Sequence, residues 1–287
     1  MKIAVLCNTG PHGWLKAGAG SEGDLDFELY KHIAKTAEKG VLDILFFADG
    51  VGIKTLGLSN RDQEMVGNGV HFEPTTLLGA LSQVTENIGL VATISTTYAH
   101  PYHIARQIGS LDFLSKGRAR WNVVTSSSLE EALNFGYDQQ LDQAVPYRRA
   151  NEAVDAVFSL WESFGADAFP RNEASRQYFL RDRMKATDHD GEFFKIKGPL
   201  NMPRPPQGRP IISQAGTSSD GHLMAARTAD VMYAKYTTLE GGRAFRNQMS
   251  GMLAQFGRAP SKLAVLKERD SPLWVGRKRQ RYDSGTS

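Results

Sequence analysis

A run of small and hydroxyl-bearing residues follows one apolar segment of the chain and could bind a phosphate group. The run covers residues 214–221, with the sequence Gln-Ala-Gly-Thr-Ser-Ser-Asp-Gly, and it separates a predicted strand from a predicted helix. Small residues let the backbone approach a ligand, Ser218 and Ser219 can donate hydrogen bonds, and a helix N-terminus carries partial positive charge. The pattern predicts a phosphate site, with a serine N-cap as the simpler role of the same hydroxyl.

Polar residues also end three other apolar segments. Asp49 follows residues 44–48, Thr93 stands near the end of residues 90–95, and Asn122 and Ser126 bracket the end of residues 118–125. In a parallel barrel the carboxyl ends of all strands share one face, and active sites form there. We therefore expect these four residues and Ser218 to converge on one mouth of a barrel, although each polar group alone could also cap a turn.

Three further patterns predict little chemistry. Residues 18–23 match the dinucleotide fingerprint letter by letter, but about ten residues separate them from the preceding strand, so a flexible connection is favoured. His100 and His103 are too few for a metal site without nearby cysteines or carboxylates, and no metal is expected. Cys7 is the only cysteine, which excludes an internal disulfide and predicts a buried, inert thiol in a reducing compartment.

Short apolar segments alternate with helical patterns along most of the chain, which is typical of a parallel α/β sheet. Pro74, Pro101 and Pro146 mark the first turns of three of the helices. The predicted strands are residues 3–6, 44–48, 90–95, 118–125, 210–215, 230–233 and 263–266. Seven strands predict an incomplete TIM-type (βα)8 barrel over residues 1–266, with the last strand and helices missing. Residues 165–209 lose all periodicity and are expected to form an insertion that covers the barrel.

Composition restricts the possible partners. The chain has 287 residues, 41% of them hydrophobic, and a net charge of only +3. Basic residues in the stretch 267–287 account for that charge, so the body has no nucleic-acid footprint, and we expect an atypical, disordered basic tail there. No stretch approaches the ~18 apolar residues of a membrane span. A cytoplasmic protein is predicted.

Several strings in a fixed order resemble the bacterial luciferase-like flavin monooxygenases, and most of all the branch of nitrilotriacetate monooxygenase component A. The resemblance extends from residue 1 to about residue 265. The strings are Phe-Phe-Ala-Asp at 46–49, Ala-Thr-Ile-Ser-Thr-Thr-Tyr at 92–98, Trp-Asn-Val-Val-Thr-Ser at 121–126, Gly-Pro-Leu-Asn at 198–201, Pro-Arg-Pro-Pro-Gln-Gly at 203–208 and Gln-Ala-Gly-Thr-Ser at 214–218.

The resemblance implies a TIM barrel that takes up reduced FMN from a separate NADH-dependent flavin reductase. With O2 it would oxygenate a small organic substrate, by hydroxylation or with cleavage of a C–N or C–S bond, and intact homologues would be homodimers. Carried over by position, the residues that would line the flavin ring and ribityl side are Asp49, Thr93, Asn122 and Ser126. Tyr147 and Ser218 would reach the phosphate, with Ser219 beside them.

Two departures from the family pattern leave alternatives open. Gln143 stands where the family usually has a histidine, four residues before Tyr147, and a glutamine keeps hydrogen bonding without the titrating imidazole. The sequence after residue 266 also no longer resembles the family, so a truncated chain is expected. A non-catalytic remnant and an F420-dependent oxidoreductase on the same barrel are the rival interpretations. Neither the catalytic residues nor the substrate can be named, since irregular loops at 50–73 and 165–209 would shape the pocket.

Overall fold

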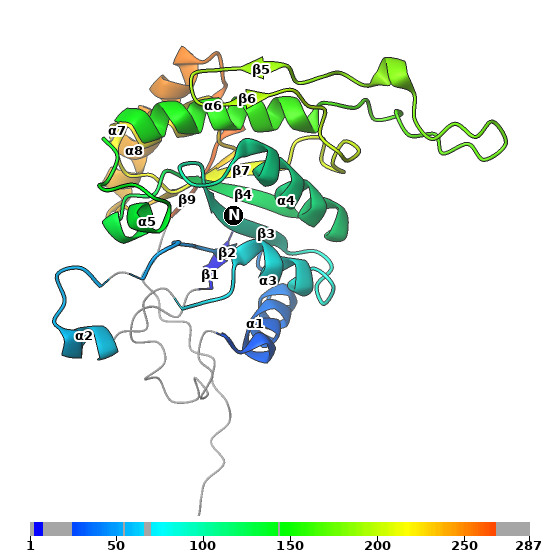
Figure 1. The fold of residues 1–287 in the computed structure, drawn as a ribbon. Helices are drawn as coiled ribbons and strands as arrows, with labels where there is room; N and C mark the ends of the chain where they lie inside the picture. The colour runs from blue at the N-terminus through cyan, green and yellow to red at the C-terminus, as the bar shows by residue number, and fades with distance from the viewer. Residues whose placement is uncertain (1–2, 8–24, 54, 66–69, 143, 268–287) are drawn as a thin grey trace, which may run out of the picture.

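Seven parallel strands form the central sheet of the molecule (Figure 1). The computed structural model describes residues 3–7, 25–53, 55–65, 70–142 and 144–267. The strand order is β1-β2-β3-β4-β7-β8-β9, and every neighbouring pair is parallel. The bounds are Ala4–Leu6, Ile44–Phe47, Gly89–Ser95, Ala119–Val124, Ile211–Gln214, Val231–Ala234 and Ala264–Lys267. All seven predicted strands are confirmed, and no end differs from the prediction by more than one residue.

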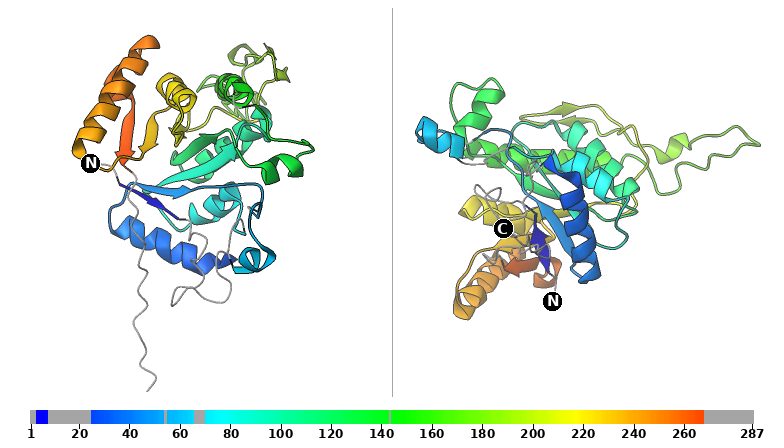
Figure 2. Two further views of the ribbon diagram at one scale, coloured as in Figure 1. Left: turned by 90° about the vertical axis from the view of Figure 1, so that its left-hand side faces the viewer. Right: turned by 90° about the horizontal axis from the view of Figure 1, so that it is seen from below.

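The sheet curls around an interior made by alternate residues of its strands. Ile44, Phe46 and Val91 are buried on this inner face, and the ring of Tyr233 on β8 lies 4.6 Å from the Phe46 ring, centroid to centroid. Ala4 on β1 and Leu266 on β9 pack on the same cluster, so the two ends of the sheet approach each other (Figure 2). Within the described residues no strand pairing joins β1 to β9. The architecture is a nearly closed seven-stranded barrel, as predicted.

Helices cover the outer face of the barrel. They are α1 Phe27–Lys39, α3 Pro74–Leu81, α4 Pro101–Leu114, α6 Ala144–Trp161, α7 Ser219–Thr228 and α8 Leu239–Gln255. Trp121 of β4 and Trp161 of α6 are fully buried in the layer between sheet and helices. The Trp161 indole N–H donates to the Ala105 carbonyl at 3.0 Å, which satisfies its polar atom and joins α6 to α4.

Local sequence signals explain where these helices begin. The Asp26 side chain accepts from the Leu29 N–H and caps α1, and Gly40 follows its last turn. Helix α6 begins two residues before Pro146, because the Asp142 carboxylate accepts from the Ala144 N–H. Pro146 still lies in the first turn, where its missing N–H removes no intrahelical bond.

The segment 165–209 leaves the barrel after α6 and returns before β7. It contains the short helix η3 Arg181–Arg183 and an antiparallel hairpin of β5 His189–Asp190 and β6 Lys195–Ile196. The stretch between α6 and η3 projects away from the body (Figure 1). The turn of this hairpin, residues 191–194, is held by Glu152 of α6. Its carboxylate accepts from His189 Nε2 at 3.0 Å and from the backbone N–H groups of Phe193 and Phe194.

Two short helices were not predicted. Helix α2 Asn60–Met65 interrupts the long connection after β2, and α5 Leu129–Asn134 follows β4. The glycine pattern at 18–23, the tail at 268–287 and Gln143 lie outside the described residues. No helix in the described part of the chain is both long and apolar enough to cross a membrane.

Candidate functional site

The carboxyl ends of the strands form one face of the barrel, called the mouth below. Because all seven strands are parallel, the residues at these ends share that face. Asp49 lies two residues beyond β2, Thr93 and Asn122 are paired neighbours on β3 and β4, and Ser126 lies two residues beyond β4. Ser218 lies beyond β7 and begins α7. The structure therefore brings the sequence-predicted residues to one face.

Tyr147 and Ser218 meet at the mouth from two different elements. The phenol oxygen of Tyr147, in the first turn of α6, lies 2.7 Å from Ser218 Oγ. Ser218 Oγ also accepts from the Gly221 N–H at 3.1 Å, so the predicted N-cap is confirmed. A hydroxyl has two acceptor lone pairs and one donor, so the Ser218 O–H can still donate to a ligand when Tyr147 donates to it. Ser219 is the exposed first residue of α7.

Two glycines keep the space beside this pair open. A Cβ atom on Gly221 would lie 3.2 Å from both the Tyr147 hydroxyl and Ser218 Oγ, and 3.1 Å from the Gly216 Cα. Such distances are tighter than ordinary van der Waals contact, so a larger residue would crowd the hydroxyl pair. The junction is also exposed at Thr217, Ser218 and Ser219. Open backbone, two hydroxyls and a helix N-terminus together make a cradle suited to a phosphate.

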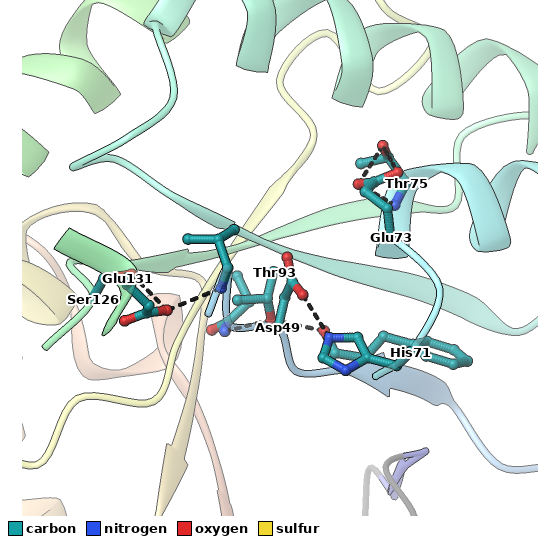
Figure 3. Close-up of polar contacts among 10 residues, drawn as sticks. Asp49, His71, Glu73, Thr75, Thr93, Ser126 and Glu131 are labelled. Atoms are coloured by element: carbon teal, nitrogen blue, oxygen red, sulfur yellow. Dashed lines mark hydrogen bonds and ion pairs between the residues drawn. The ribbon is translucent and has the colours of Figure 1, made fainter. Parts of the chain in front are cut away.

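The inner wall below the mouth carries a short buried hydrogen-bond chain. Asn122 Nδ2 donates to Thr93 Oγ1 at 3.0 Å, and Thr93 Oγ1 donates to the Phe47 carbonyl at 2.7 Å (Figure 3). Both side chains are 2% exposed. Among the described residues, Asn122 Oδ1 has no hydrogen-bond partner. A buried acceptor without a partner is unfavourable, which makes this oxygen suited to an N–H or O–H of a ligand.

Ser126 holds an uncommon backbone conformation at the rim of the mouth. Its φ angle is 51°, in the left-handed region that non-glycine residues seldom adopt. Its Oγ lies 3.0 Å from Ser95 Oγ and 3.4 Å from Glu131 Oε1. Strained positions of this kind persist where neighbouring contacts hold them, and they concentrate at functional sites.

The sequence interpretation missed three charged or titratable residues at the mouth: His71, Glu130 and Glu131. His71 Nε2 lies 2.8 Å from Asp49 Oδ1 (Figure 3). This pair lines an open hollow of about 290 Å³ whose other walls include residues 50–53, Glu73 and Asn134. A hollow at the mouth gives a small molecule room beside Asp49.

Helix α5 holds the connection after β2 against the mouth. Glu131 Oε1 accepts from the Val51 N–H, and Glu130 Oε1 accepts from the N–H groups of Thr55 and Leu56. The hydrogen bond from Leu56, with that from the Ser128 side chain, lowers the pKa of Glu130 to about 2. Ser128 and Glu131 form a complete capping box, and the spacing Ser-x-x-Glu in the sequence is the signal that predicts this helix.

The remaining candidates have structural roles. The His100 side chain accepts from the Tyr102 N–H and caps α4. Cys7 is buried, and burial raises the pKa of its thiol to about 12, so it stays protonated at neutral pH. Within the described residues, no three His, Cys, Asp or Glu side chains are grouped as metal ligands.

Comparison with known proteins adds the family context. The profile of the family described as luciferase-like monooxygenase matches residues 1–279. Over 93% of its length the chain is 45% identical to N-acetyl-S-(2-succino)cysteine monooxygenase of Bacillus subtilis (strain 168), and it covers 59% of that protein. Over 88% of its length it is 43% identical to nitrilotriacetate monooxygenase component A of Aminobacter aminovorans, covering 57%. The chain thus spans less than two thirds of the length of these relatives.

Solved structures show the same barrel. The crystal structure of a long-chain alkane monooxygenase superposes with a TM-score of 0.87 at 29% identity, over 93% of this chain and 63% of that one. A riboflavin lyase with modified FMN and substrate riboflavin superposes with a TM-score of 0.84 at 26% identity, over 93% of this chain and 61% of that one.

Proposed function

The chain belongs to the luciferase-like monooxygenase family, and from that premise we propose that it is the oxygenase component of a two-component, FMN-dependent monooxygenase. It would use reduced FMN and O2 to oxygenate a small organic substrate, by hydroxylation or with cleavage of a C–N or C–S bond. The relatives are named as monooxygenases of different substrates, one of them as a component A, which supports a separate reductase as partner. We also propose that the oxygenase component forms a homodimer.

One observation carries the proposal: the cradle of Tyr147, Ser218 and two close glycines at the mouth. A phosphate carries negative charge, and here it would meet hydroxyl donors and the positive end of α7. The space beside the hydroxyl pair would be closed by any side chain at Gly221. The first residue of α7, Ser219, would lie beside the same phosphate.

The other predicted residues fit the remainder of FMN. The buried Asn122 Oδ1 can accept an N–H or O–H, and Thr93 fixes the orientation of this amide by accepting from its nitrogen. Asp49 and Ser126 present polar atoms at the rim on either side. When bound, reduced FMN would supply the reaction with O2, and the protein would orient the ring and exclude water from it.

Binding of FMN to the 287-residue chain tests the proposal. We expect FMN fluorescence to be quenched on titration, and the affinity to fall in Ser218→Ala and Tyr147→Phe. A hydrogen bond to a charged group contributes about 1.5–3 kcal/mol, so Ser218→Ala should weaken binding by about 10- to 150-fold. Ser110→Ala removes a hydroxyl from the outer helix α4 and should leave the affinity unchanged.

Two results would contradict this assignment. Equal affinity of the Ser218→Ala, Tyr147→Phe and unaltered chains would remove the phosphate cradle. Uptake of the deazaflavin F420 in place of FMN would support the hydride-transferring alternative.

A further inference from the structure

The connection between β2 and α3 starts and ends beside one carboxylate. Asp49 is the second residue after the strand, and His71 lies 22 positions later, near the start of α3 at Pro74. The two side chains are 18% and 21% exposed, and they share the wall of the hollow at the mouth. The sequence does not predict this contact. The residues between Asp49 and His71 have no hydrophobic periodicity that would show where the chain comes back to Asp49.

The imidazole occupies one oxygen of the carboxylate. An ionised carboxylate only accepts hydrogen bonds, so the 2.8 Å contact requires the proton on His71 Nε2. The second oxygen of Asp49 points away from the ring (Figure 3). In the described part of the chain, His71 is the only group that hydrogen-bonds to the Asp49 side chain. One oxygen is therefore fixed, and the other is available to a donor in the hollow.

Other contacts already hold both ends of this connection. Near its start, Glu130 and Glu131 accept from three backbone N–H groups of residues 51–56. At its end, the Glu73 carboxylate accepts from the Thr75 and Thr76 backbone N–H groups and caps α3. Loss of the imidazole would leave these anchors in place. The particular effect of His71 is therefore on the orientation of the Asp49 carboxylate.

We propose that His71 is a positioning residue that fixes Asp49 Oδ1, so that the other carboxylate oxygen accepts a hydrogen bond from bound flavin. The donor would be a ring N–H or a ribityl hydroxyl, the two donor types of flavin that can approach from the hollow. This inference rests on the proposed function. Preorganising the acceptor removes the entropy loss of ordering it on binding, which is how a residue without ligand contact raises affinity.

Two substitutions of His71 separate the effect of its hydrogen bond to Asp49 from the effect of its side-chain volume. The amide nitrogen of Gln has nearly the reach of His Nε2, so His71→Gln keeps the donor, whereas His71→Leu removes it. For FMN titrated into each variant we expect a loss of about 10-fold in His71→Leu and near-normal affinity in His71→Gln. The visible absorbance of bound FMN should change in His71→Leu and return in His71→Gln.

His189→Leu is the matched control, because it removes an imidazole with a similar partner and a similar exposure of 20%, and His189 does not line the hollow beside Asp49. It should lower thermal stability without altering FMN affinity. Normal FMN binding that is equal in all three His71 forms, or a loss in His71→Gln as large as in His71→Leu, would overturn the positioning role alone. Absence of FMN binding by the unaltered chain would overturn the proposed function, and this inference with it.

Discussion

Two histidine–carboxylate pairs in this molecule look alike and differ in their surroundings. At the mouth, His71 contacts Asp49 at 2.8 Å; on the β5–β6 hairpin, His189 contacts Glu152 at 3.0 Å. The exposures of the four side chains lie between 14% and 21%. Glu152 also accepts from two backbone N–H groups, and a Cβ on Gly191 would clash with its Oε1. Asp49 instead borders an open hollow.

The other hydrogen bonds of each carboxylate, not the histidine contact itself, distinguish the two pairs. We call a carboxylate whose hydrogen bonds hold a neighbouring segment in place a structural clamp, in contrast to one that can bind a ligand. Every donor around Glu152 comes from the hairpin that it anchors. Burial alone would raise the pKa of Glu152, but the hydrogen bonds from His189, Phe193 and Phe194 lower it, so the charged form is the one the fold stabilises. Among the residues that the structure describes, none donates to the second oxygen of Asp49, which leaves this oxygen for a ligand.

Glu152→Ala should produce the largest effect, and the effect should be on folding. Removal of the carboxylate leaves His189 and two backbone N–H groups without their acceptor, which we expect to lower the free energy of unfolding by ~3 kcal/mol. Urea denaturation measures it. Glu162→Ala, one residue beyond the end of the same helix, removes an exposed ion pair with Arg209 and should change stability by less than about 1 kcal/mol. Equal effects of the two substitutions would contradict the clamp.

Asp49→Asn should show the opposite profile. It keeps the shape of the side chain but removes the charge that accepts from flavin, so FMN affinity should fall by about 10-fold or more. Stability should change by less than about 1 kcal/mol, because the anchors from α5 and Glu73 remain. Titration of FMN and urea denaturation of the same samples give both quantities. A large loss of stability with unchanged affinity would make Asp49 a second clamp.

The contrast also shows what the sequence could predict. Apolar segments and cap residues such as Asp26 and Ser218 act locally, so seven strands and the start of α7 were predicted to within a few residues. Polar residues at strand ends also follow from a parallel topology. The pairs Asp49–His71 and Glu152–His189 could not be predicted, because each joins residues across 22 or 37 positions through segments without periodicity. Helix α5 was missed although Ser128 and Glu131 carry its signal.

The smallest effect is expected for a substitution of Glu130, whose carboxylate holds the connection after β2 in place at the mouth. Its hydrogen bonds to the Leu56 and Thr55 N–H groups should protect these two amides from hydrogen exchange, and Glu130→Gln should reduce that protection locally. Hydrogen exchange followed by NMR measures it, with the Phe193 amide, held by Glu152, as the internal reference.

The protection of these amides should also depend on pH, in a direction set by the pKa of Glu130. The pKa of Glu130 is lowered to about 2 in the folded chain, so its contribution is complete above the ordinary carboxyl pKa and is lost as the pH falls from there toward 2. After correction for the intrinsic exchange rate, protection of Thr55 and Leu56 should therefore be constant from pH 7 to about 5 and decline only in more acidic solution. A loss of protection near neutral pH would mean that Glu130 does not hold the connection. The hollow beside Asp49 would then owe its shape to the Asp49–His71 pair and to Glu131.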